Sequence, residues 1–167
     1  MSSATAESAG YPSFLHCLQD FYRHAGQELP YFDSDAQSPL TFEASVGDVT
    51  LSVGYDPSAG DASLFIYCPF GPVPSDRSEL VLRRVLASSV GAAREHNATY
   101  CIDTATGELA YYLRRNPTQV DAAWLREELV RVAQEAEQWR ADPFLSVPQE
   151  SESSKTQAPF SPRHAFA

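Results

Sequence analysis

Three side chains near the start of the sequence have the types and spacing that could hold a metal ion. His16, Asp20 and His24 recur at intervals of four residues, so a helix over this segment would place two imidazoles and a carboxylate on one face. That face lies opposite the apolar stripe of the same helix, where water covers polar side chains. We therefore interpret the three residues as a hydrated surface, and we keep a metal-dependent activity there as the enzyme alternative.

The residues that other catalytic sites require are missing. A P-loop needs glycines before a Lys-Ser or Lys-Thr pair, and the only lysine of the chain, Lys155, lies near the C-terminus. No GxSxG, HExxH, CxxC or EF-hand pattern occurs. Cys17, Cys68 and Cys101 stand beside apolar residues at no metal-ligand spacing, which predicts reduced core cysteines. The sequence therefore predicts a protein that is not an enzyme and that uses no cofactor or metal.

Net charge and hydropathy exclude two classes of partner. The chain has 22 acidic and 12 basic residues, for a formal charge of −10, and a field of this sign repels nucleic-acid phosphates. No stretch has the apolar length needed to span a bilayer, and residues 1–10 lack the basic start and apolar run of a signal peptide. We expect a cytoplasmic protein that binds no nucleic acid and inserts into no membrane.

Apolar patterns predict the elements that position these residues. Apolar residues recur at helical spacing from Tyr11 to Ala25, and alternating runs at 40–46 and 49–55 flank a tight Gly47-Asp48 turn. Further segments predict a strand at 62–70, a helix at 75–93 capped by Ser75, a hairpin at 98–103 and 108–115, and a last helix ending near residue 141 and capped by Thr118. The order α-β-β-β-α-β-β-α predicts an α+β fold, with helices packed on a twisted, mainly antiparallel sheet.

The same patterns divide the chain into three parts. Residues 11–141 carry every predicted element and form one domain. Residues 1–10 predict a flexible N-terminus, and residues 142–167, rich in Pro and Ser without a sustained period, predict a flexible tail.

The predicted second helix has apolar residues on two sides. One stripe contains Val81, Leu82, Val85, Leu86 and Ala92, and another contains Leu80, Ala87 and Val90. A single sheet covers only one side of a helix, so the second side requires another partner.

This arrangement resembles the class I type III secretion chaperones, a Tir-chaperone-like family. The similarity runs from about Tyr11 to Trp139. It includes the opening helix at Phe14-Leu15-His16-Cys17-Leu18, the strand with Val49-Thr50-Leu51, the turn from Asp103 to Leu109, and the closing helix with Leu125, Leu129 and Trp139. The resemblance implies a homodimer built on the second helix and the strand after it, here Leu80, Ala87, Val90, Gly91, Ala98 and Tyr100. The small residues of that helix agree with this, because they let two helices approach closely.

The resemblance also implies that the chain binds the extended N-terminal segment of a secreted effector, through hydrophobic patches and strand addition at a sheet edge. The corresponding surfaces are the first helix and first three strands, with Leu15, Leu18, Tyr22, Phe42, Val53, Phe65 and Tyr67 as candidate contacts. The alternative for each of these residues is that it fills the core of the subunit. The tail would gate this surface or contact the export apparatus, such as a secretion ATPase. An adaptor of the same fold, with a folded regulatory partner, is the alternative function.

Overall fold

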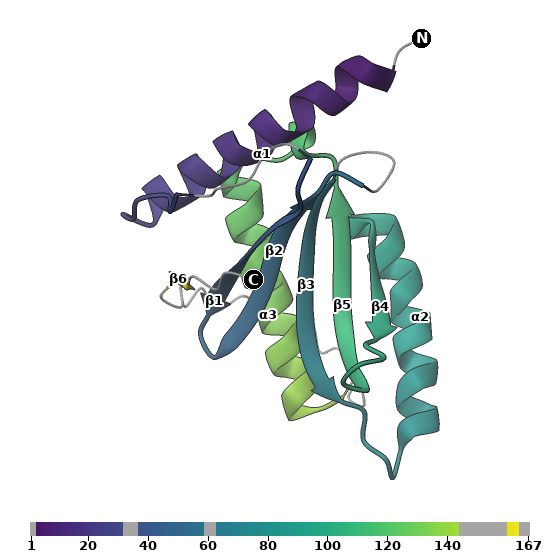
Figure 1. Ribbon diagram of the computed structural model, residues 1–167. Coiled ribbons are helices and arrows are strands. Elements are labelled where there is room, and N and C mark those ends of the chain that lie inside the picture. The colour runs from purple at the N-terminus through teal and green to yellow at the C-terminus, as the bar shows by residue number, and fades with distance from the viewer. Residues whose placement is uncertain (1–2, 32–36, 59–62, 144–159, 164–167) are drawn as a thin grey trace.

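The computed structural model of the chain describes residues 3–31, 37–58, 63–143 and 160–163 (Figure 1). Its helices and strands are α1 (Ser3–His24), β1 (Leu40–Val46), β2 (Val49–Asp56), β3 (Ser63–Pro72), α2 (Ser78–His96), β4 (Ala98–Ile102), β5 (Glu108–Arg115), the 3-10 helix η1 (Pro117–Gln119), α3 (Ala122–Ala141) and β6 (Phe160–Arg163). The predicted order from the first helix to the last is confirmed, and β6 is an addition to it.

All strand pairs of the sheet are antiparallel, in the order β4-β5-β3-β2-β1-β6. The β1–β2 hairpin turns through Gly47 and Asp48, as the sequence predicts. Gly47 has a φ of +57°, the conformation that a type II′ turn requires at its first central position. The turn pairs Val46 with Val49 and thereby fixes which side chains of both strands face the core.

The core lies between one face of the sheet and α3. Alternate residues of the strands point to this face and are buried, among them Ala44, Leu51 and Ile66. The predicted apolar stripe of α3 packs against them, and Leu125, Leu129, Val132, Ala136 and Trp139 are all buried. In Figure 1, α3 lies behind the sheet, α2 flanks β4, and α1 crosses the ends of the strands. None of the described helices is long and apolar enough to cross a membrane.

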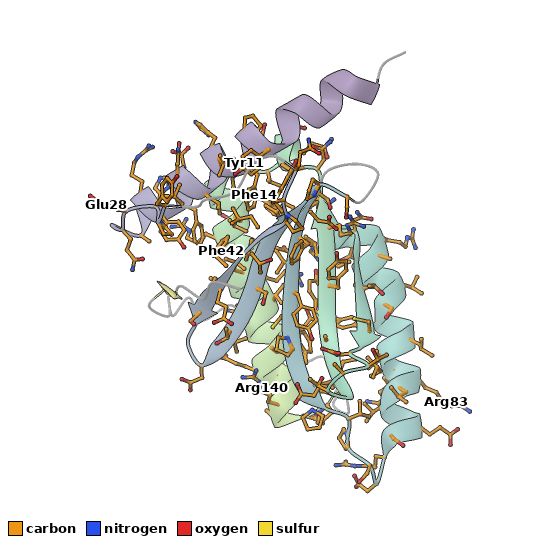
Figure 2. All side chains as sticks on the ribbon, in the orientation of Figure 1. Tyr11, Phe14, Glu28, Phe42, Arg83 and Arg140 are labelled. Carbon is orange, nitrogen blue, oxygen red and sulfur yellow. The ribbon has the colours of Figure 1, made fainter. Side chains whose placement is uncertain are left out.

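Helix α1 begins at Ser3 rather than at Tyr11, so it starts within the segment predicted to be flexible. Residues 3–10 include alanines, which favour a helix, but they contain no large apolar residue whose spacing would reveal one. From Tyr11 onward the helix packs on the strand ends. Tyr11 and Phe14 point from α1 toward the sheet (Figure 2) and lie 5.3 and 5.4 Å from Tyr55 between ring centroids.

Two predicted helix caps are wrong. Helix α2 begins after Arg77, without a side-chain cap, rather than at Ser75. Helix α3 is capped by Asp121, whose Oδ1 accepts a hydrogen bond from the Trp124 N–H at 2.8 Å. Asn116 caps the short helix η1 instead, because its side chain accepts from the Thr118 N–H. Several capping residue types occur together in both segments, and only the backbone geometry decides which of them is used.

The C-terminal tail contributes a strand that the sequence did not predict. β6 pairs antiparallel with β1, and Phe160 lies opposite Val46 and Arg163 opposite Glu43. A four-residue strand that contains Pro162 has too short a pattern for alternation to be recognised. The remaining residues of the predicted flexible tail, 144–159 and 164–167, lie outside the described residues.

Candidate partner-binding surfaces

Helix α2 carries an exposed apolar surface on the side away from the sheet. Val81 and Val85 are buried, whereas Leu80, Leu82, Leu86 and Val90 are 47%, 36%, 69% and 60% exposed. We call these four exposed residues the α2 outer face. Arg83 on the same side points into solvent in Figure 2. The prediction that Leu82 and Leu86 face the sheet is wrong, because the buried side of the helix is narrower than the predicted stripe.

The residues predicted to form a dimer interface occupy different positions around this surface. Leu80, Ala87 and Val90 are exposed, and Gly91 and Tyr100 are half-buried. Ala98 is 4% exposed and fills the core of its own subunit, so its side chain offers almost no surface to a second copy.

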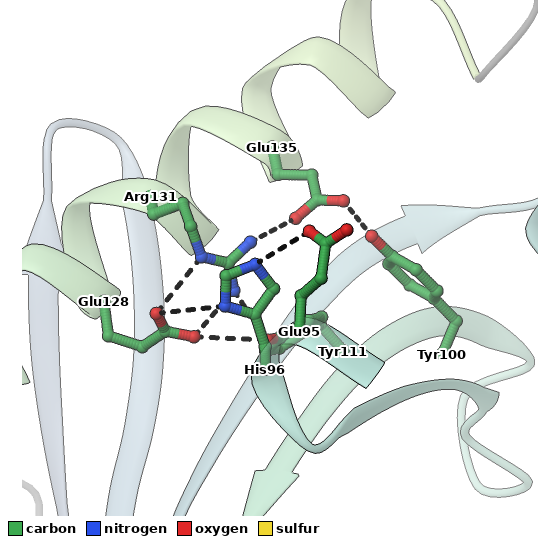
Figure 3. A network of polar contacts seen from close by, with 7 residues as sticks. All are labelled: Glu95, His96, Tyr100, Tyr111, Glu128, Arg131 and Glu135. Carbon is green, nitrogen blue, oxygen red and sulfur yellow. Dashed lines mark hydrogen bonds and ion pairs between the residues drawn. The ribbon is translucent and has the colours of Figure 1, made fainter. Parts of the chain in front are cut away.

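A polar network joins α3 to β4, β5 and the end of α2 (Figure 3). Arg131 donates to Glu128 Oε1 at 2.7 Å and to Glu135 Oε2 at 3.0 Å. Arg131 also donates to the Tyr111 hydroxyl at 2.6 Å, and the Tyr100 hydroxyl donates to Glu135. The network therefore connects the strand next to α2 with the helix that covers the sheet, through charge-assisted hydrogen bonds.

Burial changes the acidity of one member of this network. It raises the pKa of the Glu135 carboxyl from its ordinary value of 4.5 to about 7, because a partly desolvated carboxylate loses hydration that the protein does not fully replace. Neutralisation of Glu135 at acidic pH is therefore favoured by the fold, although Arg131 lies beside it.

The second face of the sheet has no helix over it among the described residues, as the side toward the viewer in Figure 1 shows. Two of the predicted effector contacts, Phe65 and Tyr67, lie on this face and are half-buried. The Phe65 ring stacks on Tyr112 with centroids 6.2 Å apart, and the Tyr67 hydroxyl donates to Asp103 Oδ2 at 2.7 Å. We call Phe65, Tyr67 and Tyr112 the aromatic row of the open face.

Gly54 makes room for the Phe65 ring of the aromatic row. A Cβ at this position would stand 2.4 Å from Phe65 Cζ and 2.6 Å from the Leu40 carbonyl oxygen. The Phe65 ring therefore occupies the space that any other residue at position 54 would need, which is a close approach that only glycine permits.

Four of the seven predicted effector contacts belong to the core. Leu18, Tyr22, Phe42 and Val53 are between 0 and 2% exposed, because they lie where α1 meets the inner face of β1 and β2. Their side chains offer no surface in this structure, and the core alternative describes them. Leu15 is half-buried at the edge of that cluster, so it remains a candidate contact together with Phe65 and Tyr67.

The candidate metal ligands of α1, His16, Asp20 and His24, make polar contacts within the helix. The Asp20 carboxylate pairs with Arg23, and His16 Nδ1 lies 3.6 Å from its other oxygen. His24 Nδ1 lies 2.8 Å from the Asp20 backbone oxygen rather than from the carboxylate. In the part of the chain that the structure describes, no group of three or more His, Cys, Asp or Glu side chains could hold a metal.

Two of the three cysteines match their prediction. Cys17 and Cys68 are buried free thiols, and burial raises the pKa of each to about 12, which keeps them protonated. Cys101 is exposed on β4, so the prediction of a core position is wrong for this residue. The alternation of residues in β4 does not indicate which face of the strand other elements cover.

Comparison with known proteins places the chain in a family. The sequence model of the Tir chaperone protein (CesT) family matches residues 16–140, whereas a search of curated proteins finds no match. The fold is similar to a chain of the HopA1-SchA chaperone-effector complex, with a TM-score of 0.57 and 15% identity over 77% of this chain and 94% of that one. It is also similar to a chain of the ExsC-ExsE complex, with a TM-score of 0.55 and 17% identity over 81% and 96%.

The extent of the family match agrees with the architecture. Residues 16–140 contain the C-terminal part of α1, all strands from β1 to β5, all of α2, and nearly all of α3. The match thus covers nearly all of the core described above, and not one motif within it. The chain belongs to the Tir chaperone protein (CesT) family.

Proposed function

We propose that this protein is a cytoplasmic type III secretion chaperone, a homodimer that binds the extended secretion segment of an effector and keeps it soluble for export. The observation that carries the proposal is the match to a chaperone family across the folded core. The similarity to a chain of a chaperone-effector complex supports an effector as the partner. Such a protein acts by binding, without a catalytic step.

The open face and the β1 edge of the sheet suit an extended polypeptide. The aromatic row supplies apolar surface, and Tyr67 and Asp103 supply polar groups beside it. A sheet edge offers backbone N–H and C=O groups that accept a strand of any sequence, while neighbouring side chains select which residues fit. The two features together would hold an unfolded segment without requiring it to fold.

The α2 outer face supports the proposed homodimer. Leu82, Leu86 and Val90 recur at intervals of four residues and are all exposed, so they form one continuous apolar stripe. Such a surface on a protein in water marks an interface. The stripe lies beside β4, at the opposite end of the sheet from β1 and β6, so dimerisation through it would not cover that end.

Co-expression with N-terminal segments of candidate effectors tests the proposal. We expect one segment to co-purify with the chain and to stay sensitive to protease beyond the bound region. Phe65→Ala should weaken its binding about 5-fold to 30-fold, the loss of roughly 1–2 kcal/mol that truncation of an interface aromatic costs. Gln134→Ala, on the exposed side of α3, should leave binding unchanged.

Two results would contradict the proposal. One is a chain that stays monomeric and captures no effector segment. The other is capture of folded regulatory proteins alone, which would favour the adaptor alternative.

A further inference from the structure

The edge of β1 is already occupied by the chain's own tail. β6 lies along the last four residues of β1, Glu43 to Val46, with Ser161 opposite Ser45 and Pro162 opposite Ala44. β1 has seven residues, so Leu40, Thr41 and Phe42 have no partner on this side among the described residues. A short strand thus covers part of the surface that the proposed function assigns to an effector.

The register identifies which backbone groups hold β6. In an antiparallel pair, alternate residues direct their N–H and C=O to a given neighbour. The two-residue turn makes Val46 and Val49 a hydrogen-bonded pair, so Ala44 also faces β2, and Glu43 and Ser45 face β6. Ser161 and Arg163 therefore supply the groups that bind β1, and the nitrogen of Pro162, which has no hydrogen to donate, faces outward.

Compared with a strand that pairs along all of β1, β6 is a weak competitor for the edge of β1. It pairs through only two of its residues, whereas a strand along all of β1 would also reach Thr41. The tail is tethered, however, and a tethered segment competes at an effective concentration in the millimolar range. A short tethered strand can thus cover the edge in the free protein and still leave when a longer strand arrives.

We propose that residues 160–163 act as an internal substitute for the effector strand, which covers the edge of β1 in the free protein and is displaced when an effector segment pairs there. The proposal rests on the proposed function, because it describes how that binding site is regulated. A tail that is docked nine-tenths of the time lowers the apparent affinity for a competing strand about tenfold. The tail thus excludes segments whose pairing with β1 is too short to overcome this tenfold loss of affinity.

Backbone hydrogen exchange on the full chain tests whether β6 docks. Ser161→Pro removes the N–H that faces β1, and Ser161→Ala keeps it. We expect the amides of Glu43 and Ser45 to be protected in the wild type and in Ser161→Ala, and to exchange faster in Ser161→Pro. The amide of Ala44 faces β2 and serves as an internal reference. Equal protection of Glu43 and Ser45 in all three proteins would overturn the docking.

A labelled peptide of residues 156–167 tests the competition, because it contains a strand that fits the edge. We expect it to bind Ser161→Pro about tenfold more tightly than the wild type or Ser161→Ala, as followed by fluorescence anisotropy. Equal affinity for the three proteins would overturn the regulation.

If the proposed function is wrong, the co-expression experiment would show it, and not the two experiments on the tail. Such a failure would leave the exchange and peptide results intact and show itself only as the absence of a co-purifying effector. In that case the tail would still cover the edge, and the competing strand would belong to another kind of protein.

Discussion

Replacement of Leu86 by alanine should weaken the proposed dimer without unfolding the subunit. The side chain is 69% exposed and takes little part in the core. Complete burial of a leucine contributes about 1.5–3 kcal/mol, so burial of the exposed part would contribute about 1–2 kcal/mol in each subunit. A two-fold interface contains every residue twice. The substitution should therefore cost about 2–4 kcal/mol of dimer stability.

This cost corresponds to a roughly 30-fold to 1,000-fold increase in the dimer dissociation constant. Sedimentation velocity over a range of protein concentrations would measure it, and urea unfolding under monomeric conditions would show whether the subunit keeps its stability. Gln134→Ala on α3 is the matched control and should dimerise like the wild type. A wild-type chain that sediments as a monomer at micromolar concentration, or a Leu86→Ala variant with unchanged dimerisation, would refute the assignment of this face.

Three further predictions concern the stability of the subunit, measured by urea unfolding. Burial raises the pKa of Glu135 to about 7, so its stabilising contribution is complete below pH 4.5 and is lost as the pH rises through 7. With rising pH the free energy of unfolding should therefore fall, and Glu135→Gln should remove up to about 3 kcal/mol of this fall. A variant whose stability depends on pH as the wild type's does would contradict this. Gly54→Ala should cost about 1–3 kcal/mol because its Cβ would overlap Phe65 and the Leu40 carbonyl; a neutral effect would mean that the ring moves freely. Asp121→Ala should cost about 1 kcal/mol through loss of the α3 cap, a value that Thr118→Ala should not reproduce.

The sequence predicts the central sheet well because its strands are covered on one face. In β1, Phe42, Ala44 and Val46 are buried while Thr41 is exposed, and a pattern of period two follows directly from this environment. The Gly47-Asp48 turn adds a strong local signal. The stripe of α3 is predicted for the same reason, since one side of that helix meets the sheet.

The candidate surfaces are harder to predict, because apolar residues have the same appearance in a core and at an interface. Phe42 and Phe65 both lie in β strands, yet Phe42 is buried under α1 and Phe65 lies on the open face. The spacing of apolar residues predicts that Leu86 lies on the buried side of α2, whereas the structure exposes it. Such differences depend on how helices are placed over the sheet, which local spacing does not encode. The pairing of β6 with β1 likewise joins segments that are far apart in the chain.

The orientation of Pro162 has a consequence for the solubility of the protein. A sheet that ends in an open strand invites strands of other molecules, and edge-to-edge growth of this kind leads to aggregates. With β6 in place, the outermost strand presents a proline nitrogen that cannot donate a hydrogen bond. The proposed function brings the protein into contact with unfolded segments, which makes this hazard greater, and a proline in the outermost strand would prevent further strands from pairing there.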